Sequence, residues 1–309
     1  YSLAEKHEEI HDLKIEYIYD CTEKSIMNDT IDIKDKNALH NFSVQAILLK
    51  DGIRKTSSFD FSFKKYDIKK FKEKLEKEIA TFKDKLTEES VKTDNYKIIL
   101  SNTCVRKLLN YFSFAFFAED INKHTSLLWD KFNTQIFSNK INIIEDPTDE
   151  KLLGTTLFDS EGVKTYYKEI VKDGKFITKL YNKKSASEDK VASTGNSDGV
   201  RNLYIKPGSA SFNDLMQKLK EGIFIENIQA LFAGINKTTG EISVMAEGYL
   251  VKEGKKKKHL NMIILSTSLF ELFNNVIEIG NDIEMNDQTC AGVSMLIDNI
   301  KIVGNKDSR

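Results

Sequence analysis

Cysteine is scarce in this sequence, and long hydrophobic runs are missing. The three cysteines, Cys21, Cys104 and Cys290, are widely spaced and odd in number. This argues against a disulfide framework and predicts a reducing compartment. No apolar run is long enough to span a bilayer, and the first residues, YSLAEKHEEI, lack the apolar core of a signal peptide. We therefore expect a cytoplasmic protein with no membrane partner.

The sequence also lacks an excess of charge of either sign. Lys and Arg total 46 and Asp and Glu total 47, which gives a formal net charge of −1. No global field attracts such a chain to nucleic acid. With 309 residues, 40% hydrophobic and 30% charged, the chain can form one large or two ordinary globular domains. Its start at Tyr1 rather than at Met suggests a fragment.

The first part of the chain mixes strand and helix patterns. Segments 14–20 and 42–49 have the β-branched and aromatic content of strands, and Asp51-Gly52 predicts a hairpin turn. Over 66–86 the apolar residues step by three and four, which predicts a surface helix with one buried stripe. The stripe consists of Ile68, Phe71, Leu75, Ile79, Phe82 and Leu86.

The rest of the chain is mostly strand-like. A buried strand is expected at 96–100, and another lies around 140–146. Segment 104–121 is apolar on nearly every face, as a helix in the interior of a domain must be. Hairpin turns are predicted at Asp173-Gly174 and Glu253-Gly254. Two helices are expected to start at serines with an acidic partner three residues on, Ser211 with Asp214, ending at Gly222, and Ser268 with Glu271.

These elements predict an α+β fold with two regions. Residues 1–94 form an N-terminal region that carries the surface helix. Residues 95–309 form a large, mainly antiparallel β domain with a buried helix. The polar stretch 87–95 is the best candidate for the linker between them.

Residues 7–11, HEEIH, match the H-E-x-x-H signature of a zinc peptidase helix. A helix over Leu3 to Leu13 would place His7 and His11 one turn apart, with Glu8 as the base. That helix would lie at a chain end and carry few apolar residues, and no third-ligand motif accompanies it. We therefore interpret HEEIH as part of a charged surface helix.

Five segments between Asn95 and Gly304 resemble, in the same order, segments of the TldD/PmbA family, whose members are called modulators of DNA gyrase or TldD/TldE peptidases. They are TTLFDSEGVKT (155–165), KDGKFITKLYNKKSASEDKVASTGN (172–196), EGIFIENIQALFAGINKTTGEISVMAEGYLVKEGK (221–255), LFELFNNVIEIGNDIE (269–284) and QTCAGVSMLIDNIKIVG (288–304). The resemblance implies that residues 1–94 are the remainder of the family's N-terminal α/β domain.

The resemblance also implies where a metal would lie. The TldD arm of the family carries H-E-x-x-x-H on a helix, joined by a cysteine near the C-terminus, whereas the PmbA (TldE) arm lacks this motif and acts as a partner subunit. Alignment of LLNYFSFAFFAED (108–120) with that helix puts Asn110, Tyr111 and Ala115 at its ligand and base positions. Asn is a poor zinc ligand, Ala offers no donor atom, and Tyr has too high a pKa to replace Glu as a base.

The resemblance therefore implies no metal and no cofactor in this chain, and zinc in a partner subunit alone. Cys290 lies at or near the family's cysteine, but one thiolate cannot hold a catalytic zinc. We interpret Cys290 as a small buried residue.

Two further segments carry candidate groove residues. Asp159 and Glu161 could act as an acid/base pair, or they could cap backbone N–H groups in a turn set by Gly162, which we favour. Segment 193–196 does not fit a phosphate loop and suits the rim of a groove that, by resemblance, holds an extended peptide. Its residues are Ser193, Thr194, Gly195 and Asn196. Lys255 to Lys258 is interpreted as a solvated hairpin tip.

Three hypotheses follow. The first is a non-catalytic subunit of a cytoplasmic TldD/TldE-type metallopeptidase complex, which binds unfolded peptide beside a TldD-like subunit or a second copy of itself. The second is an active peptidase that uses His7, Glu8 and His11. The third is a non-enzymatic modulator of DNA gyrase, which the balanced charge does not favour.

Overall fold

The computed structural model describes residues 7–27, 29, 32–86 and 88–304. The chain divides into two units, Tyr1–Glu89 and Ser90–Arg309. The division falls inside the polar stretch 87–95. Among the helices that the structure describes, none combines the length and the hydrophobicity that a membrane crossing requires.

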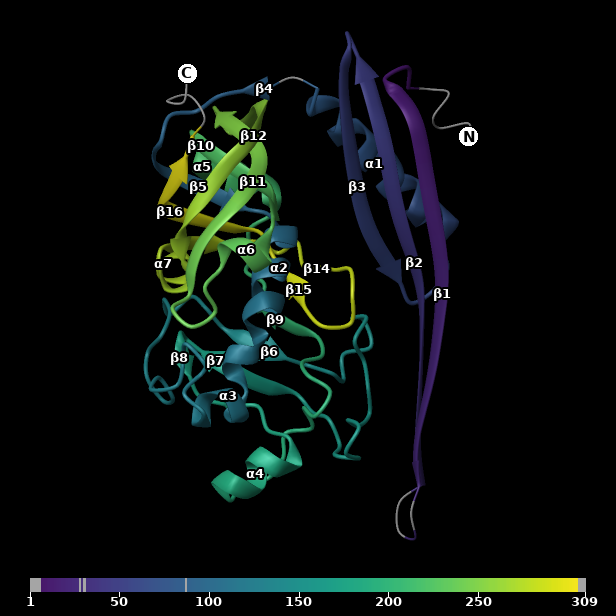
Figure 1. The fold of residues 1–309 in the computed structure, drawn as a ribbon, viewed down its shortest axis with the longest axis vertical. Coiled ribbons are helices and arrows are strands. Elements are labelled where there is room, and N and C mark those ends of the chain that lie inside the picture. The colour runs from purple at the N-terminus through teal and green to yellow at the C-terminus, as the bar shows by residue number, and fades with distance from the viewer. Residues whose placement is uncertain (1–6, 28, 30–31, 87, 305–309) are drawn as a thin grey trace. The chain divides into compact units, whose positions relative to one another are not determined.

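The first unit is a three-stranded antiparallel sheet with one helix. Its strands β1 (Ile10–Met27), β2 (Asp32–Lys50) and β3 (Ile53–Phe63) are joined in the order β1-β2-β3, and α1 (Ile68–Asp84) follows. Pairing of β2 with β3 ends at His40 opposite Phe63, so β1 and β2 continue beyond that point as a two-stranded ribbon (Figure 1). The short strand β4 (Glu88–Glu89) ends the unit.

The core of this unit lies between α1 and the sheet. The predicted helix is confirmed, and its stripe is buried from Phe71 to Leu86, whereas Ile68 at its start is exposed. The helix packs against Phe42, Val44 and other sheet residues in one apolar cluster. The turn between β2 and β3 has the positive φ angles at Asp51 and Gly52 that a type I′ hairpin requires.

The helix expected over Leu3 to Leu13 is wrong for the residues that the structure describes. Residues 7–9 form a turn, Ile10 begins β1, and Leu13 pairs with Ala46 of β2. Residues 3–6 lie outside the described part of the chain. A short charged segment gains little from an isolated helical turn, since helix nucleation is costly. Pairing with a long neighbouring strand therefore decides its conformation.

The second unit is built around a large sheet. Its strands follow the order β13-β16-β5-β10-β11-β12, and the parallel pair β5 and β10 is flanked by antiparallel neighbours. Strand β16 also pairs with β12, so five strands close into a ring. The strands are β5 (Asp94–Leu100), β10 (Gly222–Gln229), β11 (Glu241–Lys252), β12 (Lys255–Ser268), β13 (Val276–Ile279) and β16 (Met295–Val303).

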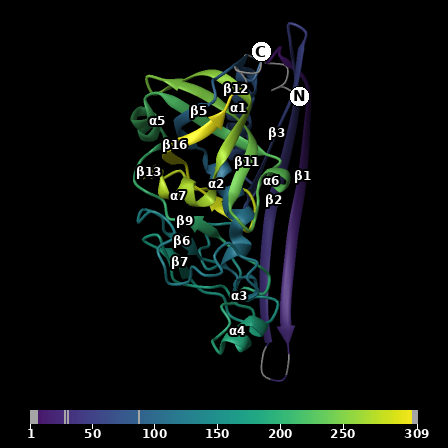
Figure 2. The same ribbon diagram turned by 60° about the vertical axis from the view of Figure 1, so that its left-hand side comes forward.

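A four-stranded sheet of order β8-β7-β6-β9 lies beyond one end of the large sheet, with α3 and α4 beyond it again (Figures 1 and 2). Its strands are β6 (Ile143–Glu145), β7 (Lys168–Lys172), β8 (Lys175–Phe176) and β9 (Leu203–Ile205), and a small pair is formed by β14 (Glu284–Met285) and β15 (Ala291–Gly292). The helices are α2 (Asn102–Phe112), α3 (Ala118–Asn122), α4 (Lys183–Asp189), α5 (Phe212–Leu219), α6 (Leu231–Gly234) and α7 (Leu269–Asn274).

The turn signals of the sequence are confirmed, and one of the two predicted capping boxes is formed in full. Both residues of each predicted hairpin turn, at Asp173-Gly174 and Glu253-Gly254, have positive φ. Ser211 and Asp214 form a reciprocal capping box on α5, which ends at Leu219 rather than at Gly222. Ser268 accepts the backbone N–H of Glu271 at the start of α7, while the Glu271 carboxylate accepts from the Thr267 hydroxyl. The α+β class predicted from these elements is confirmed.

The single helix expected over 104–121 is divided into three pieces. After α2, residues Ser113–Phe116 form a 3₁₀ turn, Phe117 is extended, and α3 begins at Ala118. The break coincides with strand-like pairing to Leu180, whose N–H donates to Phe116 O at 2.8 Å and whose C=O accepts from Ala118 N at 2.9 Å. Tertiary hydrogen bonding therefore overrides the local helical pattern.

A buried ion pair joins two strands of the smaller sheet. Lys168 Nζ on β7 lies 2.9 Å from Glu145 Oε2 on β6, and both side chains are almost fully buried. Burial raises the pKa of the Glu145 carboxyl, and the Lys168 ammonium opposes that rise. The other Glu145 oxygen accepts from Asn196 Nδ2 and from the Arg201 backbone N–H. This network supplies the partners that a buried carboxylate needs.

Replacement of Lys168 tests this pair. We expect Lys168→Met to lower the free energy of unfolding by about 3–5 kcal/mol, since it leaves a buried carboxylate without its counter-ion. The loss should be larger at pH 8 than at pH 5. Without Lys168, the folded-state pKa of Glu145 stands above its unfolded value, so the folded state holds more protons and stability falls as pH rises. Urea unfolding of the wild-type chain and the variant at pH 5 and pH 8 measures the change in the free energy of unfolding.

The matched control is the double variant Glu145→Gln/Lys168→Met. A neutral amide removes the titrating group, so the extra loss of stability between pH 5 and pH 8 should vanish. Equal pH dependence in the single and double variants would contradict this account of the pair.

Candidate functional site

Helix α2 is the element on which the sequence places the family's metal position. The hydroxyl of Ser101 caps its start by accepting the Cys104 N–H at 3.1 Å. One face of the helix is buried in the main apolar cluster of the unit, through Cys104, Val105, Leu108, Leu109 and Phe112. Burial of this face fixes where the remaining side chains of α2 point.

The three candidate positions at the end of α2 differ in environment. Asn110 is exposed, and Tyr111 is half-buried with its ring centroid 4.6 Å from the ammonium of Lys237. Ala115 is buried and lies on the 3₁₀ turn, where its C=O accepts from the Ser126 hydroxyl. Position 115 is therefore not on the α-helix that carries 110 and 111. Of these three side chains, only the neutral amide of Asn110 and the phenol of Tyr111 carry atoms that could bind a metal.

Cys290 packs at the other half of α2. It is fully buried, and its N–H donates to Asp287 Oδ1 at 3.2 Å. Asp287 also forms an ion pair of 2.7 Å with Arg106 of α2, four residues before Asn110. Burial, reinforced by the nearby Asp287 carboxylate, raises the pKa of the Cys290 thiol. In the absence of a metal, the thiol is therefore protonated at neutral pH.

Zinc does not fit the residues at this position. Its usual donors are thiolate, imidazole and carboxylate, whereas Asn110 and Tyr111 present an amide and a phenol and Cys290 offers a single sulfur. More widely, across the part of the chain that the structure describes, no three His, Cys, Asp or Glu side chains are grouped so as to hold a metal ion.

The HEEIH segment does not have the geometry of a zinc helix. His7 lies in a turn, its C=O accepts the Ile10 N–H, and His11 is already in β1 at an irregularity of the β1–β2 register. The helical spacing that would direct His7 and His11 to one face is absent from 7–11. The hypothesis of a peptidase built on this segment loses its structural basis.

The carboxylates of the 159–162 segment act as caps. Asp159 is buried, and its oxygens accept the backbone N–H groups of Glu161, Val163 and Ser197 at 2.9–3.0 Å. Gly162 has a φ of +75°, as the turn requires. Glu161 Oε2 accepts the backbone N–H of Lys183 at the start of α4, at 2.7 Å. The capping interpretation of the two carboxylates is confirmed.

The 193–196 segment belongs to the same polar cluster. The Ser193 hydroxyl donates to the Tyr181 C=O, and the Thr194 hydroxyl lies 2.8 Å from Asn196 Oδ1. Asn196 in turn donates to Glu145 of the buried ion pair. The structure therefore brings the two predicted segments together, joined through Ser197 and Asp159. Their side chains are engaged within the fold, and a role at the rim of a groove stays a prediction.

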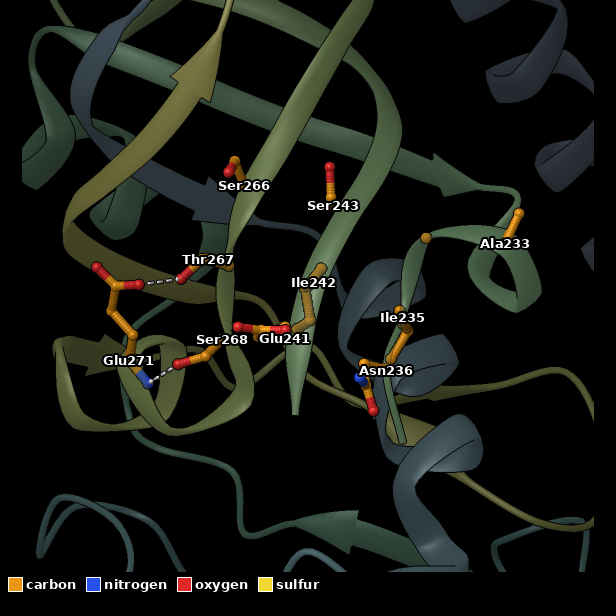
Figure 3. A pocket seen from close by; sticks show the side chains of 11 residues that line it. Ala233, Ile235, Asn236, Glu241, Ile242, Ser243, Ser266, Thr267, Ser268 and Glu271 are labelled. Carbon is orange, nitrogen blue, oxygen red and sulfur yellow. Dashed lines mark hydrogen bonds between the residues drawn. The ribbon is translucent and has the colours of Figure 1, made fainter. Parts of the chain in front are cut away.

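A cavity of about 920 Å³ lies elsewhere, beside α6, β11 and β12 (Figure 3). Its charged residues are Glu241 and Glu271, and hydroxyl groups line much of the remainder. The sequence reasoning missed it, although Ser266, Thr267 and Ser268 end β12 and Ser243 lies on the neighbouring β11. The lining consists of Ala233, Gly234, Ile235, Asn236, Glu241, Ile242, Ser243, Ser266, Thr267, Ser268 and Glu271.

Comparison with known proteins places the second unit in a family. The model of the PmbA/TldA metallopeptidase C-terminal domain matches residues 93–304. The chain is 33% identical over 235 residues to a metalloprotease PmbA homolog of Buchnera aphidicola subsp. Baizongia pistaciae, covering 70% of this chain and 52% of the relative. It is 28% identical over 220 residues to metalloprotease PmbA of Escherichia coli O157:H7, covering 71% and 48%. The chain thus spans about half the length of these curated relatives.

Two solved structures are similar to this chain over a larger part of its length than the curated relatives are. A Thermotoga maritima protein named as a candidate modulator of a DNA gyrase matches with a TM-score of 0.87 and 25% identity, over 97% of this chain and 71% of that one. TldE from Thermococcus kodakarensis shares the fold, with a TM-score of 0.83 and 20% identity over 93% and 68% of the two chains. The resemblance of the five segments is confirmed, and this chain belongs to the PmbA/TldD family of metallopeptidase-related proteins.

Proposed function

We propose that this chain is a PmbA/TldE-type subunit without zinc in a cytoplasmic, bacterial TldD/TldE-type metallopeptidase complex. In this proposal a TldD-like partner supplies the zinc and the proteolytic chemistry. This chain contributes a wall of the chamber and contacts to unfolded peptide. Family membership supports the connection with metallopeptidases, and the side chains at α2 support the non-catalytic role.

The observation that carries the proposal is the set of three residues at and just after the end of α2. A zinc peptidase needs two ligands and a carboxylate base on this helix, and Asn110, Tyr111 and Ala115 supply neither. The ammonium of Lys237 also lies 4.6 Å from the Tyr111 ring and 4.9 Å from the Phe114 ring. A positive charge held at this point opposes a dication beside it, since like charges repel. The cation–π contact places this positive charge beside the Tyr111 ring, which supports the proposal that no zinc binds there.

The cavity beside α6 suits a contact with unfolded peptide. It is lined by hydroxyl and amide groups that can bind a peptide backbone, and Phe232 next to it is 84% exposed. Polar groups that fix orientation beside an apolar contact are typical of peptide-binding surfaces. One similar protein is named as a modulator of DNA gyrase. A role of this kind through binding to nucleic acid gains no support from the charge of this chain, whose formal net charge is −1.

Metal analysis with a peptidase assay tests the proposal. The purified chain, incubated with zinc and then freed of excess metal, should retain far less than one zinc per chain and cleave no unfolded peptide. Addition of a TldD-like subunit should give zinc-dependent cleavage. The measurements are elemental mass spectrometry and hydrolysis of a fluorogenic peptide.

Cys290→Ser is the matched variant for that test. Because the thiol is protonated and packed, its loss should leave both the zinc content and the activity with the partner unchanged. Stoichiometric zinc in the chain alone, lost in Cys290→Ser, would overturn the proposal.

Thiol reactivity gives a second test of the same position. Burial raises the pKa of Cys104 to about 12 and also raises that of Cys290, so neither forms a thiolate at pH 8. We expect brief iodoacetamide treatment of the native protein to leave both unmodified in peptide mass spectra. Unfolding in guanidinium should make both react fully. Rapid native alkylation of Cys290 would show an accessible thiolate and contradict this description of the site.

A further inference from the structure

The cavity beside α6 continues onto the outer face of β11 and β12. Along the start of β11, Glu241, Ser243 and Met245 are exposed and alternate with buried residues, so all three point away from the core. The first two line the cavity. Met245, the next residue on this face, is 47% exposed. One surface therefore joins the polar cavity to an exposed apolar side chain.

Cross-strand pairing divides this outer face into three successive rows, which we name the acidic, the hydroxyl and the apolar row. The three pairs are Glu241 with Ser268, Ser243 with Ser266, and Met245 with Ile264. Figure 3 shows the two serines of the hydroxyl row on their neighbouring strands. Because serine side chains are small, this row leaves space between the acidic and the apolar row.

Two carboxylates lie at the acidic row. Glu271 of α7 lies beside Ser268, whose hydroxyl accepts its backbone N–H at 3.1 Å. The Glu271 carboxylate accepts from the Thr267 hydroxyl at 2.8 Å, and the Glu241 carboxylate accepts from the Thr239 hydroxyl at 3.2 Å. Among the residues that the structure describes, neither carboxylate forms an ion pair. A carboxylate offers about four lone-pair sites, so both can still accept from a cationic group.

The lysines around the cavity leave this negative charge in place. Lys301 of β16 lies opposite Ser266, in line with the hydroxyl row, and Lys237 is held over two aromatic rings. Within the described part of the chain, neither ammonium pairs with Glu241 or Glu271. The acidic row therefore attracts a cation, whereas its charge repels phosphate groups and carboxylates.

We propose that this face binds an extended segment of unfolded peptide in which a lysine or arginine lies four positions from a large apolar residue. The basic side chain enters the cavity and pairs with Glu241 and Glu271. The apolar side chain packs on Met245, whose flexible thioether chain adapts to apolar groups of different shapes. This inference rests on the contact with unfolded peptide proposed above and adds the chemistry of the side chains that are bound.

The spacing in the peptide follows from the spacing on β11. Glu241 and Met245 are four residues apart on the strand, which corresponds to roughly 13 Å of extended chain. An extended peptide that lies along β11 covers the same distance in four residues. Its side chains at that spacing also point to one side, as every second residue of an extended chain does. A basic and an apolar side chain can then contact both rows together.

Binding of matched peptides to the purified chain tests the proposed peptide chemistry. The reference is a labelled Gly/Ser peptide with Lys and Leu four positions apart; a second peptide replaces Lys by Glu, and a third places Leu three positions from Lys. At low ionic strength we expect the Glu peptide to bind about tenfold more weakly, because attraction becomes repulsion. The third should bind about threefold more weakly, since its two side chains point to opposite sides. Fluorescence polarisation measures all three, and equal affinity for the Lys and Glu peptides overturns the inference.

Charge removal on the protein tests the acidic row. Glu241→Gln/Glu271→Gln should weaken binding of the Lys peptide about fivefold and abolish its advantage over the Glu peptide. The matched control is Glu188→Gln/Glu221→Gln, which removes two exposed carboxylates outside the cavity lining. It should leave the affinity within about twofold. An equal loss in both double variants would show an effect of net charge alone and would overturn the site.

The same measurements separate this inference from the function proposed above. Binding of every peptide regardless of charge would overturn the preference for a basic residue and leave the proposed subunit role standing. Failure to bind any of the peptides would overturn both this inference and the proposed contact with unfolded peptide. The zinc content of the chain is measured independently of either result.

Discussion

Closure of the large sheet is the constraint on which the second unit depends. Strand β16 pairs with β13, β5 and β12, so the sheet closes on itself and the interior can be filled by apolar side chains alone. Helix α2 follows directly from β5, and its buried face belongs to the same cluster. The ion pair between Arg106 and Asp287 then fixes the segment before Cys290 against that helix. The end of α2, where the sequence resemblance predicts the family's metal position, is thus held in place by packing.

Packing also holds the shape of this position without a metal. A structural zinc contributes folding energy directly, but here apolar burial and hydrogen bonds hold every neighbouring segment. Tyr111 contacts Lys237, Ala115 accepts from Ser126, and Cys290 packs as a neutral thiol. Hydrogen bonds also hold the predicted groove segments within the fold. Asp159 accepts from backbone N–H groups, and the Asn196 amide donates to the Glu145 carboxylate. The Asp159 and Glu161 carboxylates therefore stabilise the fold by accepting backbone N–H groups.

Local signals predicted the fold well where one short segment decides the structure. Asp51-Gly52 and Asp173-Gly174 adopt the backbone angles that glycine permits, and Ser211 forms the expected capping box. The predictions failed where a distant partner decides. Residues 10–13 join β1 because β2 lies beside them. The 104–121 helix breaks at Phe117 because the backbone groups on either side of Phe117 form hydrogen bonds with Leu180. The cavity beside α6 was missed for the same reason, since three separate segments form it.

The central claim is that the end of α2 has no affinity for zinc. Anomalous diffraction at the zinc edge, from crystals of this chain soaked in zinc, tests it most directly. The account predicts no anomalous peak within bonding distance of Asn110, Tyr111 or Cys290. A strong peak coordinated by any two of these side chains would contradict it.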